Sequence, residues 1–193
     1  YSSAASDVYK RQALGSAADA AAMANVYVNT NMAAAGGLVA AIVLASILYG
    51  KADLSLALNG ALAGLVSITA GPDVALPLQA IIIGAVGGVL CTLAIPLLDK
   101  LKIDDVVGAI SVHLVAGIWG TLVVGIPGLG TLAADFVTQL IGVVAIGVFV
   151  VVVSAITWLI LKGVVGLRPT EEEEMSGLDV SELGMEAYPE FRN

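Results

Sequence analysis

Residues 110–120 read ISVHLVAGIWG and contain His113, the only histidine of the chain. Small and apolar residues surround this ring for about two helical turns on either side. An imidazole in such a segment needs hydrogen-bond partners, because leaving a buried polar group unpaired costs free energy. The stretch predicts an apolar helix with one polar side chain, and the composition of the chain indicates where such a helix lies.

The composition is typical of a membrane protein. Of the 193 residues, 59% are hydrophobic and 12% are charged, with a mean hydropathy of +0.98. Soluble domains carry about 25% charged residues, and the 22 glycines suit close helix packing in lipid. The sequence has no basic patch for nucleic acid. Its single cysteine, Cys91, forms no internal disulfide and joins no Cys/His cluster, so we expect no metal and no cofactor.

The net charge of −8 is concentrated at one end of the chain. Residues 166–193 hold eight acidic and two basic side chains, whereas the preceding residues are close to neutral. We therefore expect a membrane domain over residues 13–165 and a tail over residues 166–193. Residues 1–12, YSSAASDVYKRQ, are polar and differ from the apolar segments after them, and we interpret them as a leader that is not native to the fold.

Five apolar stretches predict an all-α membrane protein with five transmembrane helices. A spanning helix needs about 20 apolar residues, and four of the five stretches reach that length. Glycine and proline at 70–77 and 125–130 predict turns. The stretches run over Val26–Tyr49, Leu54–Ala70, Pro77–Leu98, Val106–Ile126 and Phe136–Val165.

Basic residues predict the orientation of these helices. With five spans, the loops at 71–76 and 127–135 share one side of the membrane and hold no Lys or Arg. The positive-inside rule then places the other side, with the tail, in the cytoplasm. The basic residues on that side are Lys51, Lys100, Lys102, Lys162 and Arg168.

Two pairs of glycines predict close contacts between helices. Gly60 and Gly64 lie four residues apart, as do Gly84 and Gly88. Small residues at this spacing let helix backbones approach closely in lipid. The alternative is that glycine is simply common in membrane helices.

The position of His113 predicts a ring near the middle of the membrane. It lies nine residues after Asp104, about 13 Å of helix, which is close to half of a ~30 Å hydrocarbon core. Low polarity disfavours the imidazolium, so we expect a neutral ring with one donor and one acceptor. Residues three and four positions away carry no polar side chain, and Ser111 faces elsewhere. The ring therefore needs a partner from another helix or a ligand, and an intramembrane ionisable residue indicates a functional site.

Four segments of the chain are similar, in the same order, to segments of one known family. They resemble the seventh, eighth and tenth membrane helices and the cytoplasmic C-terminus of the ammonium transporter family, the Amt/Mep/Rh channels. The segments are NVYVNTNMAAAGG (25–37), LNGALAGLVSITAG (58–71), DDVVGAISVHLVAGIWGTL (104–122) and GLRPTEEEEMSGLDVSELGMEAYP (166–189).

The resemblance implies the second half of an eleven-helix, inverted-repeat ammonium channel in the bacterial inner (plasma) membrane. It implies a homotrimer in which each subunit has its own hydrophobic pore lined by two stacked histidines. His113 matches the second of these, and the first lies in the other half. It also implies a PII-type signal protein as a partner at the cytoplasmic face.

The resemblance also suggests roles for other residues. Thr69 is expected near the outer vestibule, although its hydroxyl could instead bond back to its own helix. Leu62 and Ala109 are expected along the pore, with ordinary packing as the alternative. Asp105 is expected at a helix start, where it favours the helix dipole. Gly108 stands where some family members carry an acid, so we assign it no pore role.

The tail resembles the family's C-terminus at Gly166, Arg168, Gly184 and Tyr188. Its run EEEE (171–174) is often a merely solvated stretch of charge. The apolar residues after this run suggest a segment that docks on a surface.

We therefore predict transport of ammonium or ammonia, and no enzyme activity. A dry pore resists the cation ammonium, whose desolvation is costly, and admits neutral ammonia. The alternatives are a channel for another small neutral solute, such as carbon dioxide or water, and an ammonium sensor. An intramembrane hydrolase would need a nucleophile or a second acid within the helices, and the sequence offers neither.

Overall fold

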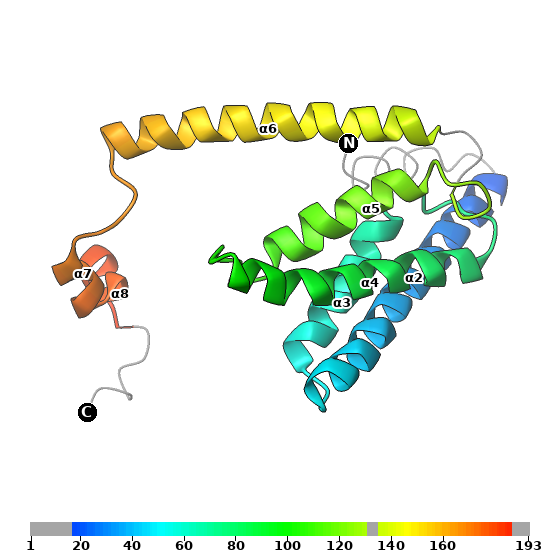
Figure 1. Ribbon diagram of the computed structural model, residues 1–193, viewed down its shortest axis with the longest axis horizontal. Coiled ribbons are helices and arrows are strands. Elements are labelled where there is room, and N and C mark those ends of the chain that lie inside the picture. The colour runs from blue at the N-terminus through cyan, green and yellow to red at the C-terminus, as the bar shows by residue number, and fades with distance from the viewer. Residues whose placement is uncertain (1–16, 131–134, 187–193) are drawn as a thin grey trace. The chain divides into compact units, whose positions relative to one another are not determined.

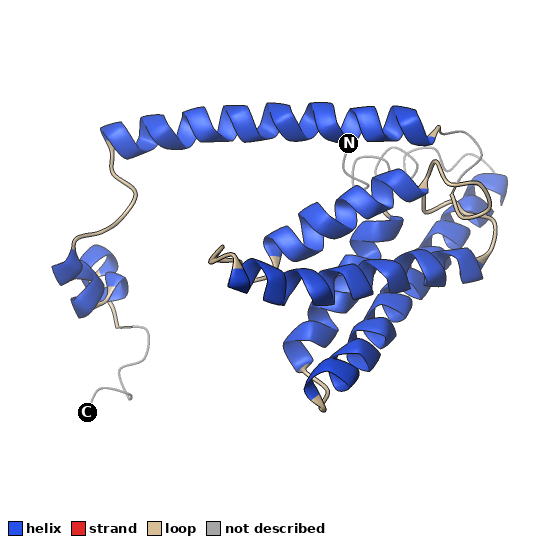
Figure 2. Ribbon diagram, in the orientation of Figure 1, coloured by secondary structure: helices blue, strands red, loops and turns tan. Residues whose placement is uncertain are grey.

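A computed structural model describes residues 17–130 and 135–186 of the protein. The expected leader and Tyr188 lie outside the described residues. The described residues form helices and connecting loops (Figure 2). In order along the chain (Figure 1), these are α2 (Ala17–Tyr49), α3 (Leu54–Ile68), α4 (Pro77–Lys100), the π-helix η1 (Ala109–Val115), α5 (Ala116–Val123), α6 (Phe136–Val164), α7 (Glu171–Ser176) and α8 (Leu178–Leu183).

The contacts divide the chain into two compact units, Tyr1–Val144 and Ala145–Asn193. In the first unit, α2, α3 and α4 pack on one another, and η1 and α5 pack on α3 and α4. In the second unit, α7 packs on α8. The expected boundary after residue 165 separates membrane segments from the tail, and it stays a prediction.

Three helices are long and apolar enough to cross a membrane: Ala18–Tyr49, Pro77–Lys100 and Phe136–Val164. The two other apolar segments form shorter helices of 15 residues each, Leu54–Ile68 and Ala109–Val123. Fifteen helical residues reach about 22 Å, less than a ~30 Å hydrocarbon core. The structure is thus an all-helical fold with three long apolar helices, and five complete spans stay a prediction.

Local chemistry explains where α3 and α4 begin. Asp53 is the N-cap of α3, where its carboxylate accepts a hydrogen bond from the Leu56 N–H at 2.9 Å. Pro77 occupies the first position of α4, where a missing N–H has no cost. The Gln79 side-chain oxygen accepts from the Leu76 N–H at 2.9 Å, which satisfies another donor at this end.

The predicted close approach at the paired glycines is confirmed. A Cβ on Gly64 or on Gly84 would overlap the backbone carbonyl of Ala33 in α2. Gly88 stands equally close to the carbonyl of Gly37, one turn further along α2. The glycines therefore let the backbones of three helices meet where no side chain fits.

The core of the first unit consists of two small clusters. Ile68, Ile83 and Val123 belong to the first, against which Trp119 packs. The second is made of Ala63, Cys91, Val112 and Ala116. Cys91 is buried there as a small packing residue.

Candidate functional site

The helix that carries His113 begins later than expected. Residues 104–108 are not helical, and η1 begins at Ala109. The predicted start at Val106 is wrong because Gly108 takes a left-handed conformation (φ 75°), which ends the preceding turn instead of continuing into a helix. The expected ~13 Å of helix between Asp104 and His113 is also wrong, since only the residues from Ala109 onward are helical.

Asp105 caps this helix through its side chain. Its carboxylate accepts hydrogen bonds from the N–H groups of Ile110 (2.9 Å) and Ser111 (3.0 Å) and from the Ser111 hydroxyl (2.9 Å). Burial raises the pKa of the Asp105 carboxyl, but these hydrogen bonds outweigh it and leave the pKa below its ordinary value. The ionised carboxylate therefore stabilises the start of η1.

His113 lies on η1 with its side chain exposed. The preceding residue, Val112, is buried against Ala63 and Ala116. Within residues 17–130 and 135–186, no hydrogen-bond partner of the ring is found. The backbone at His113 thus packs against α3 and α4, whereas its imidazole is exposed on the opposite side of η1.

The other residues predicted to line the pore have different surroundings. Leu62, which precedes the buried Ala63, is 47% exposed, and Ala109 is exposed at the start of η1. Thr69 is half-buried at the end of α3, where its hydroxyl donates to the Leu65 carbonyl at 2.7 Å. That hydroxyl can still accept a hydrogen bond from a second group.

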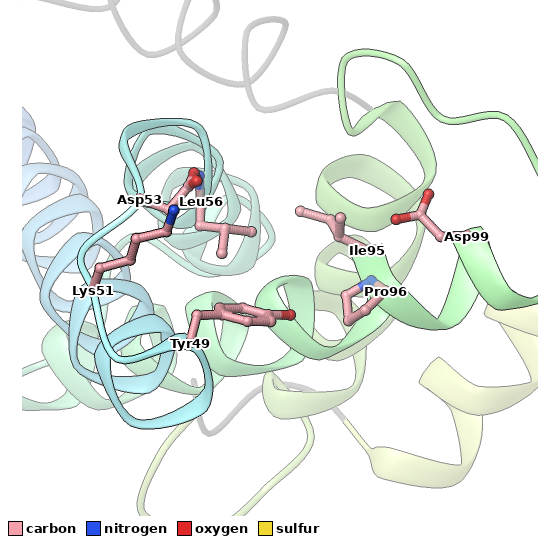
Figure 3. Close-up of a pocket in the computed structure, with 7 residues that line it drawn as sticks. All are labelled: Tyr49, Lys51, Asp53, Leu56, Ile95, Pro96 and Asp99. Atoms are coloured by element: carbon pink, nitrogen blue, oxygen red, sulfur yellow. The ribbon is translucent and has the colours of Figure 1, made fainter.

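Two neighbouring pockets of about 260 Å³ each, which the sequence did not predict, lie among the described residues of the first unit. Figure 3 shows the first, in which the ring of Tyr49, the last residue of α2, points toward Pro96 of α4. Lys51, in the loop after α2, points toward Asp53. The second is lined by Asn59, Asp105 and Gly108, among others. Both share Asp53, Leu56 and Ile95. The described residues include no group of His, Cys, Asp or Glu that could hold a metal ion.

Side-chain amides join the loops at the other end of the bundle. Asn29, which is fully buried, donates to the carbonyls of Pro72 (3.0 Å) and Val74 (2.9 Å). Gln79 donates to the carbonyl of Gly128 at 2.8 Å. The predicted turns at 70–77 and 125–130 are therefore held at one end of the first unit. The sequence pattern did not single out Asn29, because an asparagine in an apolar helix does not reveal its partner.

The tail residues lie in the second unit. Arg168 forms an ion pair with Glu174, and both are exposed. Gly166 (φ 85°) and Gly184 (φ 64°) have left-handed conformations that suit glycine, and Gly184 ends α8. Hydrogen bonds from the backbone N–H and hydroxyl of Thr170 lower the pKa of Glu173.

Residues 13–188 match the Ammonium Transporter Family. Among curated proteins, the chain is 37% identical over 180 residues to "Ammonium transporter Amt2" of Archaeoglobus fulgidus, covering 84% of this chain and 38% of that protein. It is 34% identical over 175 residues to "Ammonium transporter" of Bacillus subtilis, covering 84% of this chain and 43% of that protein.

Solved structures show the same similarity. A protein described as "Sensor Amt Protein" superposes with a TM-score of 0.75 at 35% identity, over 83% of this chain and 42% of that chain. Candida albicans Mep2 superposes with a TM-score of 0.70 at 28% identity, over 86% of this chain and 41% of that chain. The chain thus spans about two-fifths of the length of these proteins.

Proposed function

The chain belongs to the ammonium transporter family, and we propose that, within a longer transporter, it forms one side of a pore for ammonium or ammonia. The family is one of non-enzymatic channels, so the protein that contains this chain would move its substrate across a membrane without converting it chemically.

The observation that carries this proposal is the open position of His113. Its backbone is packed against α3 and α4, whereas its imidazole is exposed. An imidazole that faced lipid with neither nitrogen paired would be costly. We infer that further protein covers this face and that the ring borders a passage between them.

The chemistry of the ring suits this role. A neutral imidazole offers one N–H donor and one nitrogen acceptor, and ammonia is a small molecule that can both donate and accept. Exposed Leu62 and Ala109 add apolar surface. Such walls oppose ammonium and other cations through desolvation, and they oppose ammonia much less.

We further propose that this is the C-terminal half of an eleven-helix channel, with five spans and a trimeric assembly. The order of the four similar segments supports the C-terminal half. The positions of the loops support five crossings. One pocket contains both Lys51 and Asp99, so the chain after α2 and the end of α4 lie at the same end of the bundle. Asn29 and Gln79 bond to the loops at 71–76 and 127–130, which lie at the other end. We place the Lys51 side and the tail in the cytoplasm, where the positive-inside rule puts them.

We propose that the tail regulates transport and contacts a PII-type signal protein. It leaves apolar side chains exposed: Met175 in α7, Leu183 in α8 and Met185 just after α8. Exposed apolar residues in a charged segment favour docking on a protein surface over free solvation.

An ammonium sensor is the second candidate function. One observation favours it, the similarity to the protein described as "Sensor Amt Protein" at a TM-score of 0.75. A sensor and a transporter would bind the same small molecule, so binding does not distinguish them. A flux measurement does, because it reports movement of the molecule across the membrane.

The experiment uses the complete gene product that contains this chain, in a yeast strain without ammonium transporters. We expect growth on low ammonium with the unchanged protein, and loss of growth with His113→Ala at equal amounts in the membrane. The control is Leu114→Ala, which removes an exposed side chain from the same helix.

Each outcome bears on the proposal. Growth with His113→Ala equal to the unchanged protein would contradict a pore role for the ring. Ammonium binding by the purified protein, without uptake, would favour the sensor. Permeability to water or carbon dioxide without ammonium uptake would favour a channel for another solute.

A further inference from the structure

The π-helix η1 is wider than an α-helix, and one carboxylate satisfies donors at its start. In a π-helix each N–H bonds to the carbonyl five residues back, so the first N–H groups have no partner within the helix. Asp105 accepts two of them, from Ile110 and Ser111, at 2.9 and 3.0 Å. A third, from Val112, bonds to the carbonyl of Gly108, four residues back as in an α-helix, at 2.7 Å, so the wider spacing of η1 belongs to the residues that follow.

Ser111 ties this cap to the interior of the bundle. Its side chain is fully buried, and its hydroxyl donates to the Asp105 carboxylate at 2.9 Å. Val112 is buried as well, and the next residue, His113, is exposed. Ser111 and Val112 therefore face the interior of the bundle, and His113, the next residue, faces outward.

The segment before η1 is also held against α3. The Gly108 N–H donates to the Asp105 carbonyl at 3.0 Å. A Cβ on Gly108 would lie 2.9 Å from the side-chain oxygen of Asn59. The backbone that leads into η1 is thus closed by a hydrogen bond of its own turn and lies close to Asn59 of α3.

The width of η1 determines where the ring points. In an α-helix one residue corresponds to about 100° of rotation. If η1 tightened to an α-helix while α5 kept its packing, the residues before α5 would rotate about the helix axis by about 100°. The imidazole of His113 would then leave its present face.

We propose that Asp105 and Ser111 are positioning residues for His113. By holding the start of η1, they set the direction in which the imidazole faces. Neither touches the permeating molecule, and both act through the ring. The consequence for transport rests on the proposed function, whereas the orientation of the ring does not.

The test uses the complete protein labelled with ¹⁵N-histidine, in detergent or lipid. The signals of the His113 ring are assigned by their loss in His113→Ala. We compare Asp105→Ala and Ser111→Ala with the control Asp104→Asn, which changes the neighbouring exposed acid. Ser111→Ala removes only the hydrogen bond between the Ser111 hydroxyl and Asp105, and the bonds from the Ile110 and Ser111 N–H groups remain. This variant therefore tests the proposal even if Asp105→Ala fails to fold.

We expect shifted His113 ring signals in Asp105→Ala and Ser111→Ala, and unchanged signals in Asp104→Asn. Uptake of ammonium per inserted protein should fall about tenfold or more in Asp105→Ala, because small misplacements of a working group have large effects on rate. Ring signals that stay unchanged in Ser111→Ala and in folded Asp105→Ala would overturn the proposal. If the unchanged protein takes up no ammonium, the proposed function fails, and the ring signals still decide the positioning.

Discussion

The backbone of Gly84 in α4 lies directly against the carbonyl of Ala33 in α2, where no side chain fits. We expect Gly84→Ala to destabilise the protein by about 1–3 kcal/mol, because overpacking forces the helices apart. Thermal unfolding in detergent measures this. The control Gly142→Ala concerns a helical glycine with nothing within 4 Å and should stabilise by about 0.5–1 kcal/mol. Equal effects of the two substitutions would contradict the close packing.

Asn29 should matter more for stability than its neighbour Asn31. Asn29→Ala leaves the carbonyls of Pro72 and Val74 without their donor. We expect a loss of about 1–3 kcal/mol, the usual cost of unpaired buried groups. Asn31 is exposed and donates to its own helix at Tyr27, so Asn31→Ala should change stability by less than about 0.5 kcal/mol. Chemical or thermal unfolding of both variants checks the difference.

Trp119 joins α5 to α4 through its indole. The N–H donates to the carbonyl of Ile83 at 3.0 Å, and Trp119→Phe removes this donor while keeping an aromatic ring. We expect a cost of about 0.5–1.5 kcal/mol. Trp158, which is 59% exposed on α6, is the matched control, and Trp158→Phe should have a smaller effect. A larger effect of Trp158→Phe would show that the hydrogen bond to Ile83 contributes little.

The cap of η1 should make stability depend on pH in the acidic range. The pKa of Asp105 is lowered in the folded protein, so its contribution is complete above the unfolded value of 3.8 and is lost as the pH falls through the lower folded value. We expect the difference in Tm between the unchanged protein and Asp105→Asn to be constant from pH 7 to about pH 5 and to narrow below about pH 4. A difference that is the same at pH 3 and pH 7 would mean that ionisation of Asp105 does not matter.

The tail should influence transport through its apolar residues. Deleting residues 169–193 should lower ammonium uptake, or abolish its response to a PII-type protein. Replacing Leu178 and Leu183 of α8 with serine should have the same direction of effect, because both are exposed and need a surface to dock on. Uptake is measured at equal amounts of protein in the membrane. Unchanged uptake and regulation in both variants would favour the alternative of a merely solvated tail.

Much of the fold results from local patterns that the sequence displays. Asp53 and Pro77 mark the starts of α3 and α4, because capping and a missing N–H act within a single turn. The start of η1 could not be predicted in this way, since Val106 and Val107 continue the apolar run and only the conformation of Gly108 interrupts it.

The candidate site was predictable in its residues and not in its geometry. The imidazole of His113 stands out in any apolar helix, and Asp105 is recognisable as an acid near a helix start. The role of Ser111 could not be predicted from the sequence. Its partner, Asp105, lies six residues earlier, and no regular helix brings side chains together at that spacing.

The sequence by itself determined the membrane class, the apolar segments and the glycines at which helices meet, because these depend on hydropathy and on spacing within one helix. The tertiary structure decided which groups satisfy one another across the chain. Asn29 reaches carbonyls 43 and 45 residues away, and Trp119 reaches one 36 residues away. Such contacts depend on how the helices pack, and packing also decided that Val112 faces inward while His113, the next residue, stays open.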